Sequence, residues 1–201
     1  MKIATKRSEI NEILSDLEKN KIKINLIPTM GNIHDGHLSL LSEAKKFQGT
    51  SIVSIFINPT QFNDINDFKN YPNTFDRDVS LLSKNNCEII FAPEITEMYP
   101  NGLLTKKIVF KYREILCDIF RPSHFDGVTT IVKILLDNIK PSNIFFGEKD
   151  FQQLKIIEHM IIQNKLKINL VKCPSVRGVN GMSLSSRYSK FSANDKTTFE
   201  Q

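Results

Sequence analysis

Short apolar strands and amphipathic helices alternate along most of this chain, and this alternation restricts the fold more than any other feature of the sequence. The residues 50–57 are rich in β-branched side chains, which is typical of a parallel strand buried on both faces. We therefore predict an α/β fold with a doubly wound parallel sheet and right-handed crossovers. The strands are expected at residues 22–27, 50–57, 88–92, 143–146 and 167–171, and the helices at residues 6–19, 38–46, 75–84, 128–138 and 151–164.

Two residues mark expected boundaries of these elements. Ser8 is the expected N-cap of the first helix, because a serine side chain can accept a hydrogen bond from a free N–H of the first turn. Pro28 is expected to end the first strand, since proline cannot donate a hydrogen bond to a neighbouring strand. The regular pattern stops near Leu184, so we expect a domain over residues 1–184 and a polar tail too short to fold alone.

Composition and charge exclude several classes of protein. The chain has 201 residues, of which 40% are hydrophobic, as expected for a folded globular domain. Its net charge of +5 comes from scattered lysines, so we expect no nucleic-acid partner and leave two alternatives, a solvated basic surface or an anionic small substrate. No apolar run approaches the roughly 18 residues that a membrane span needs, so no membrane partner is expected.

The cysteines point to neither a disulfide framework nor a metal centre. Cys87, Cys117 and Cys173 are an odd number and show no metal-ligand spacing. The first residues lead into an amphipathic pattern instead of an apolar signal segment. We therefore expect a cytoplasmic protein without a prosthetic group.

The unusual residues lie in loops that follow the expected strands. Doubly wound sheets bind ligands at the carboxyl ends of their strands, where these loops meet. We therefore predict a ligand site at this edge of the sheet. The loops in question are residues 28–37, 58–63, 93–100, 147–150 and 174–187.

The turn over residues 28–37 carries the sharpest local signal. His34 and His37 stand beside Gly31 and Gly36 between a strand and a helix, where glycines let a ligand approach the backbone and the helix offers free N–H groups to an anion. Two imidazoles at this place can bind phosphate oxygens or stabilise charge that develops at phosphorus. Metal ligation is the alternative for this pair, but no third ligand accompanies it at local spacing.

Further motifs accompany this turn and together carry a family resemblance. The turn resembles the HxGH box of the nucleotidylyltransferase superfamily, and its extended form is similar to that of the pantothenate synthetases. The resemblance implies a Rossmann-like sheet of the nucleotidylyltransferase type. The other matching motifs are residues 56–62, Tyr71-Pro72, residues 121–128, residues 146–154 and residues 185–187.

The resemblance implies a two-step ligase reaction in the coenzyme A pathway. ATP and (R)-pantoate would give pantoyl adenylate and pyrophosphate, and the amine of β-alanine would then attack the adenylate to give pantothenate and AMP. Magnesium is expected to accompany ATP, and Asp78 is a candidate either for helping to hold it or for ordering the pocket. A homodimer is also implied.

The resemblance further implies roles for individual residues. His37, with His34, Lys149 and Arg187, would be catalytic by stabilising the negative charge that grows on the phosphates. Gln61 and Gln153 would hydrogen-bond pantoate, and Gln61 would also contact β-alanine. The implied ATP-binding residues are Met30, Gly31, Asn32, Ile33, His34, Asp35, Gly36, His37, Gly147, Glu148, Lys149, Asp150, Val176, Leu184, Ser185, Ser186 and Arg187.

Without the resemblance, several of these residues have plainer interpretations. The glutamines would be surface amides, Val176 a packing residue and Ser185-Ser186 part of a polar loop. The stretch 121–128 suits a wall near the substrate or a subunit contact, and we assign it no catalytic role.

The resemblance also implies a smaller C-terminal domain that covers the nucleotide. This chain has only residues 185–201 to begin such a domain, so we expect a shortened or naturally short polypeptide with this lid domain largely missing. The stretch 179–183 and Tyr188 also depart from the family pattern, which has an acidic residue and a glycine before the serines and an asparagine after the arginine. Two alternatives follow: a nucleotide-binding module with little turnover, or a related HxGH adenylyltransferase.

Overall fold

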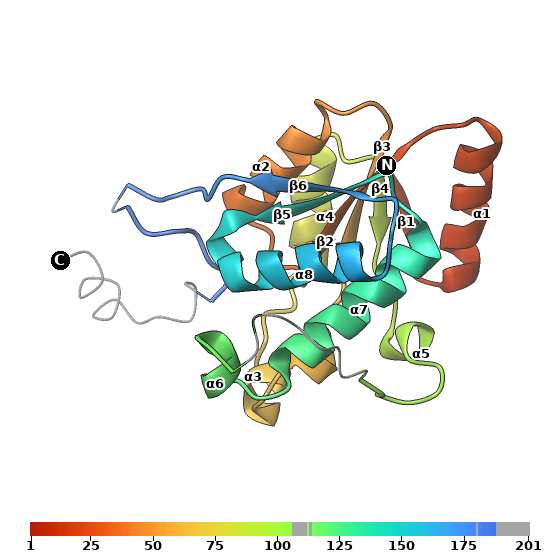
Figure 1. The fold of residues 1–201 in the computed structure, drawn as a ribbon. Coiled ribbons are helices and arrows are strands. Elements are labelled where there is room, and N and C mark those ends of the chain that lie inside the picture. Colours follow the sequence, from red (N-terminus) through yellow and green to blue (C-terminus); the bar gives the residue numbers. More distant parts are fainter. Residues whose placement is uncertain (106–111, 113, 180, 188–201) are drawn as a thin grey trace.

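The protein contains a parallel sheet with helices on both faces (Figure 1). The computed structural model describes residues 1–105, 112, 114–179 and 181–187. Over these residues the sheet has six strands in the order β1-β4-β3-β2-β5-β6, and every neighbouring pair is parallel, which confirms the predicted doubly wound α/β fold. The strands are β1 (Lys2–Ala4), β2 (Ile24–Thr29), β3 (Thr50–Ile55), β4 (Ile89–Phe91), β5 (Asn143–Gly147) and β6 (Asn169–Cys173).

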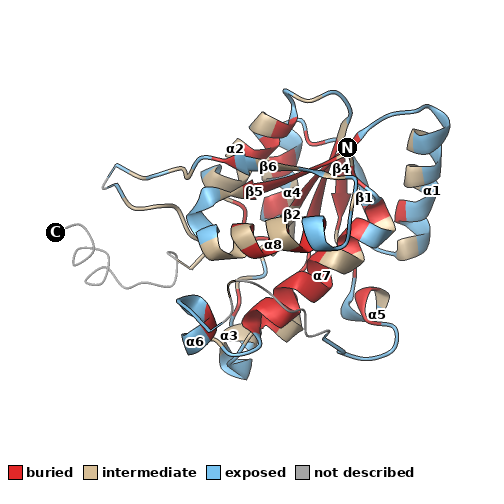
Figure 2. Cartoon of the chain, viewed as in Figure 1, coloured by how far each residue is buried: buried red, intermediate tan, exposed pale blue. Residues whose placement is uncertain are grey.

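Two hydrophobic clusters, one on each face of the sheet, attach the helices to it. Consecutive residues of a strand enter opposite clusters, as Leu26 and Ile27 do in β2, because side chains alternate across a strand. Helices α1, α7 and α8 contribute to the first cluster, and α2 and α4 contribute to the second. Figure 2 shows this burial as red strands in the centre and a largely red α7. The helices are α1 (Arg7–Lys19), α2 (Asp35–Ala44), α3 (Ile65–Lys69), α4 (Phe75–Lys84), α5 (Ile95–Met98), α6 (Cys117–Phe120), α7 (His124–Ile139) and α8 (Phe151–Gln163), with short 3₁₀ turns η1 (Pro59–Gln61) and η2 (Glu148–Asp150).

The N-terminal elements differ from the prediction in two ways. Strand β1 was not predicted, because it has three residues of which only Ala4 is buried, so that no alternating pattern can be seen. The predicted N-cap Ser8 is wrong, since α1 begins at Arg7 and its N-cap is Lys6, two residues before Ser8. The Glu9 carboxylate, at the third helical position, accepts hydrogen bonds from the N–H groups of Thr5 (2.8 Å) and Lys6 (3.2 Å), which is the glutamate half of a capping box.

Pro28 does not end its strand. Strand β2 pairs with β3 as far as Thr29, and Pro28 lies opposite Ser54. The ladder between β2 and β5 ends earlier, at Leu26 and Ile144. Because successive N–H groups point to opposite sides of a strand, the missing N–H of Pro28 faces this unpaired side and breaks no ladder bond. Beyond Leu26, β2 and β5 are no longer paired, and this is the point where the chain's direction of winding reverses.

Two helices begin earlier than their periodicity indicated. Helix α2 starts at Asp35, inside the predicted HxGH turn, and α7 starts at His124 instead of residue 128. In both helices the first turn contains polar residues and a glycine. The regular spacing of apolar residues, from which the helices were predicted, therefore begins only in the second turn. Both helix N-termini consequently lie at the edge of the sheet that was predicted to bind a ligand.

The close approach of α7 to η1 leads to a prediction for stability. A Cβ on Gly127 would lie 2.3 Å from the carbonyl oxygen of Thr60, which is backbone and cannot move aside easily. We expect Gly127→Ala to destabilise the protein by about 1–3 kcal/mol in urea unfolding. Gly147→Ala is the matched control, because a Cβ there meets nothing within 4 Å. Equal stability of the two variants would contradict this packing.

Within the described residues, no helix is both long enough and apolar enough to span a membrane. The predicted tail residues 188–201, with Tyr188, and the single residue Asn180 lie outside the described part of the chain.

Candidate functional site

A pocket of about 260 Å³ opens at the carboxyl edge of the sheet, where β2 and β5 separate. It is bounded by the HxGH turn, η1, one side of α7 as far as Leu135, the first turn of α8, and residues 174–187. The sequence placed its candidate residues in these loops, and the structure brings most of them together. Those that line the pocket are Met30, His34, Gly36, His37, Gln61, Gly147, Lys149, Asp150, Gln153, Val176, Leu184, Ser185, Ser186 and Arg187.

The two histidines of the HxGH turn are held by backbone N–H groups. His34 is the N-cap of α2, and its Nδ1 accepts a hydrogen bond from the N–H of Gly36 (3.1 Å). The Nδ1 of His37 accepts one from the N–H of His34 (3.4 Å), and the two ring centroids are 4.1 Å apart. Because both Nδ1 atoms act as acceptors, each neutral ring carries its proton on Nε2. Within the described part of the chain neither Nε2 has a hydrogen-bond partner, so both N–H donors are left for the pocket.

Both rings are held in the neutral form. Burial, followed by the charges of His34 and Lys149, lowers the pKa of His37 to about 3. Burial, followed by the charge of Lys149, also lowers the pKa of His34, and Asp35 only partly opposes this. At neutral pH the pair therefore provides two uncharged donors beside the N-terminus of α2, an arrangement suited to phosphate oxygens.

Asp78 of α4 shapes the turn from behind. Its side chain is 1% exposed, and its two oxygens accept hydrogen bonds from the N–H groups of Asn32 and Ile33, both at 2.8 Å. The Thr74 hydroxyl donates to the same carboxylate at 3.1 Å. Gly31 is required here, because it has φ +80° and a Cβ would lie 3.0 Å from the Asp78 carboxylate. Asp78 therefore orders the turn and has no oxygen that points into the pocket.

The same turn is tied to the segment that follows Leu184. The side chain of Asn32 donates to the carbonyl of Ser186 at 2.8 Å and accepts from Arg77 at 3.0 Å. Asn32 itself is in the left-handed region with φ 49°, which asparagine tolerates better than most residues. The HxGH turn and Ser186 thus form one wall of the pocket.

Gln61 is oriented by a buried amide network. Its Oε1 accepts a hydrogen bond from Asn58 (3.1 Å), and its Nε2 donates to the sulfur of Met30 (2.9 Å). Asn58 is 1% exposed, and its Oδ1 accepts from the hydroxyl of Tyr99 at 2.7 Å. These contacts direct the amide N–H₂ of Gln61, and not its oxygen, towards the pocket.

Comparison with known proteins gives the family. The sequence profile of the family Pantoate-beta-alanine ligase matches residues 2–200. The chain belongs to the pantoate–β-alanine ligase family. This confirms the resemblance that the HxGH turn and the later motifs carried.

Relatives and solved structures of this family resemble the chain over most of its length. A pantothenate synthetase of Sulfurihydrogenibium sp. (strain YO3AOP1) is 44% identical over 187 residues, which are 93% of this chain and 67% of that protein. A pantothenate synthetase of Buchnera aphidicola subsp. Acyrthosiphon pisum (strain Tuc7) is 46% identical over 89% of this chain and 64% of its own length. The chain thus spans about two thirds of these relatives. The crystal structure of a Francisella tularensis ligase, complexed with beta-gamma ATP and beta-alanine, has a TM-score of 0.96 and 37% identity, over 100% of this chain and 77% of that one.

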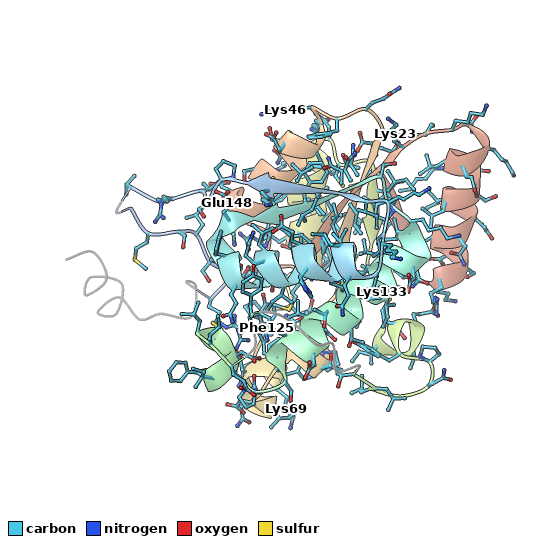
Figure 3. The ribbon with its side chains drawn as sticks, in the orientation of Figure 1. Lys23, Lys46, Lys69, Phe125, Lys133 and Glu148 are labelled. Atoms are coloured by element: carbon cyan, nitrogen blue, oxygen red, sulfur yellow. The ribbon has the colours of Figure 1, made fainter. Side chains whose placement is uncertain are left out.

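Five residues predicted to bind ATP in this ligase family member do not line the pocket. Gly31, Asn32 and Ile33 are buried behind it: the N–H groups of Asn32 and Ile33 point to Asp78, and Ile33 belongs to the second hydrophobic cluster. Asp35 and Glu148 are exposed, and the roles of all five remain predictions. The five are Gly31, Asn32, Ile33, Asp35 and Glu148, and Glu148 is labelled in Figure 3.

The positive charges of this ligase family member are distributed unevenly. Figure 3 shows Lys23, Lys46, Lys69 and Lys133 at widely separated places, in agreement with the predicted solvated surface. The pocket, in contrast, receives three cations. Lys149 is exposed and acts on both histidines, whereas Arg187 donates to Asp67 at 2.8 Å and lies 5.7 Å from the ring centre of Tyr71. The third cation is Arg121.

Several pocket residues were not assigned a site role from the sequence. Arg121 and His124 line the pocket, although the stretch 121–128 was left without a catalytic role. Asn58 and Tyr71 also line the pocket. Both lie in motifs that match the family, and this was the sequence signal that could have identified them as site residues. The apolar wall from α7 was hidden in an ordinary helical pattern; it consists of Val128, Ile131, Val132 and Leu135.

Proposed function

We propose that this chain catalyses the ATP-dependent condensation of (R)-pantoate with β-alanine to pantothenate, through a pantoyl adenylate, with release of pyrophosphate and AMP. The observation that carries the proposal is the pair of neutral Nε2–H donors, His34 and His37, beside Lys149 in a pocket of a pantoate–β-alanine ligase family member. Activation of a carboxylate on ATP needs such donors, because negative charge grows on the departing pyrophosphate and preorganised N–H groups stabilise it.

The HxGH turn would act on the phosphates. The carboxylate oxygen of pantoate attacks the α-phosphorus, and the bond to pyrophosphate breaks. His37 and His34 donate from Nε2 to phosphate oxygens, and Lys149 provides a movable positive charge. Ser185, Ser186 and Arg187 line the same pocket and are proposed as further donors. Gly147, Asp150, Val176 and Leu184 would surround the adenosine.

Gln61 and Gln153 would orient pantoate. The fixed N–H₂ of Gln61 can donate to the hydroxy acid, and Gln153 from α8 faces the same pocket. The branched hydrocarbon of pantoate would lie on the apolar wall of α7. The amine of β-alanine then attacks the acyl carbon, the bond to AMP breaks, and the amine loses its proton.

Magnesium is proposed only as the companion of ATP. Within the described residues no group of three or more His, Cys, Asp or Glu side chains could hold a metal ion, and both oxygens of Asp78 already accept backbone N–H groups. The described side chains therefore include no cluster that would hold the ion without the phosphates of ATP. We infer that an ion would be held by the phosphates and water, where it would neutralise phosphate charge.

The proposal is tested by pantoate-dependent exchange between ATP and pyrophosphate, followed by addition of β-alanine. We expect exchange with pantoate alone and pantothenate only after β-alanine is added. Binding of ATP in calorimetry without exchange would indicate a nucleotide-binding module with little turnover. Exchange with another small acid but not with pantoate would indicate a related adenylyltransferase.

We also propose a cytoplasmic homodimer with a domain boundary near residue 184. The exposed Leu116, Ile119 and Phe120 on and before α6 offer an apolar face for a second copy, and sedimentation analysis would test this.

The cytoplasmic location and the domain boundary have separate support. Cys87, Cys117 and Cys173 form no disulfide, which is compatible with a reducing compartment. Ser186 and Arg187 contact the domain that precedes them, so any boundary lies in a segment attached to the pocket.

A further inference from the structure

Arg121 is a pocket cation that forms no ion pair with the residues that the structure describes. It lines the pocket and is half-buried, yet its guanidinium forms no hydrogen bond or ion pair with any described residue. A guanidinium that is partly removed from water and left unpaired is unfavourable, so its side chain can bind an anion without first giving up another contact. Burial, followed by the charge of Arg187, lowers the pKa of Arg121, which reflects the same lack of compensation.

The backbone around Arg121 is fixed in place next to Gln61. The N–H of His124 donates to the carbonyl of Arg121 (3.1 Å), and the imidazole Nδ1 of His124 lies 2.7 Å from the carbonyl of Gln61. Because burial lowers the pKa of His124 to about 4, the ring is neutral and Nδ1–H is the donor. The side chain of Asn63 donates to the carbonyl of Pro122 and holds the turn from the other side.

The other two pocket cations have neighbours of their own. Arg187 is paired with Asp67, and the charge of Lys149 acts on His34 and His37. Arg121 influences His124 but neither histidine of the HxGH turn. Asp150 lies near enough to act on Arg121 through its charge, but it forms no ion pair with it. The charge of Arg121 therefore acts at His124, whose ring contacts the Gln61 carbonyl, and does not act on the histidines of the HxGH turn.

We propose that Arg121 binds the carboxylate of the incoming amine substrate and thereby selects an amino acid over a simple amine. This inference rests on the proposed ligase function. In β-alanine two methylene groups separate the amine from the carboxylate, so a carboxylate held by Arg121 leaves the amine directed towards an acyl group near Gln61. The amine forms the new C–N bond, the C–O bond to AMP breaks, and the amine proton is lost to water.

The test separates the two half-reactions in the full chain with Arg121→Gln. We expect the pantoate-dependent ATP–pyrophosphate exchange to stay within about threefold of the wild type. The KM for β-alanine should rise on the order of 10–100-fold, because charge-assisted hydrogen bonds are lost. Arg121→Lys should recover part of this loss, since it restores the charge but not the fork. Arg177→Gln, which changes an exposed arginine outside the pocket, is the matched control and should leave both steps unchanged.

A second measurement uses 3-aminopropan-1-ol, which has the amine but no carboxylate. The wild type should strongly prefer β-alanine, and Arg121→Gln should reduce this preference by about the same factor as its loss in kcat/KM for β-alanine. An unchanged KM for β-alanine would overturn the proposal, and so would an equal loss in exchange, which would place Arg121 on the phosphates. Absence of any exchange in the wild type would instead refute the ligase function itself.

Discussion

Replacement of Asp78 by alanine is expected to lower the free energy of unfolding by about 3–5 kcal/mol, which for a domain of this size corresponds to a fall of roughly 6–20 °C in Tm. The carboxylate is buried and accepts two backbone N–H groups and one hydroxyl, so its removal leaves buried donors without partners. The adenylation rate should fall as well, because the N–H groups of Asn32 and Ile33 are no longer held and the turn that carries His34 and His37 loses its support. Thermal unfolding by circular dichroism measures the first effect, and pyrophosphate exchange measures the second.

Asp76 provides the matched control. It lies in the same first turn of α4 but is exposed, so Asp76→Ala should cost no more than about 1 kcal/mol through the lost interaction with the helix N-terminus. Asp78→Asn keeps one oxygen that can accept an N–H, but its amide NH₂ group faces the other N–H. We expect its free energy of unfolding to lie between those of the wild type and Asp78→Ala. If Asp78→Ala were as stable as Asp76→Ala, the carboxylate would not be what holds the turn.

The fold could be predicted because burial on both faces gives each central strand a continuous apolar run. Periodicity located β3 and α4 almost to the residue. It could not locate β1, where one buried alanine is the whole signal. Pro28 misled the prediction because its effect depends on which neighbouring strand its missing N–H faces, and the local sequence does not contain that information.

In the candidate site, too, features that depend on neighbouring residues could be predicted from the sequence, whereas contacts between residues far apart in the sequence could not. The loops after the strands were located from the sequence, because the carboxyl edge of a parallel sheet is where loops meet. The contact of Asp78 with Asn32 joins residues 46 positions apart, so no local spacing indicated that this aspartate was buried. Arg121 is similar: only its place in the pocket, and the pairing of Arg187 with Asp67, distinguishes it from a surface arginine.

Replacement of His37 by asparagine is expected to lower the adenylation rate constant by about 10²–10³-fold, the usual loss when one preorganised donor to a developing charge is removed. Asparagine places an oxygen near the position of Nδ1 and can still accept the N–H of His34, but it has no donor at the position of Nε2. His37→Gln is the complementary change, because its amide N–H₂ reaches about as far as Nε2 while the acceptor for His34 is lost. We expect the glutamine variant to be more active and less stable than the asparagine variant, and the reverse order would contradict the assigned tautomer. His159→Gln, on α8 outside the pocket, controls for the loss of a histidine as such.

The neutral state of His37 also determines how the protein should respond to pH. Because its pKa is lowered to about 3, the adenylation rate should not fall as pH rises through 6.5, whereas a catalytic imidazolium would lose its proton and its effect there. The free energy of unfolding should depend on pH in the acidic range. Below about pH 6.5 His37 is protonated in the unfolded chain, whereas in the folded protein it stays neutral until about pH 3. The unfolded state therefore binds more protons, and the folded state becomes less stable as pH falls. The His37→Asn variant lacks this group, so its stability should decline less steeply between about pH 6 and pH 4, by up to about 1.4 kcal/mol per pH unit. Parallel urea titrations of the two proteins across this range measure that difference. Equal slopes, or a wild-type rate that drops between pH 6 and 7, would mean that His37 is protonated in the working pocket and acts as a cation instead of a neutral donor.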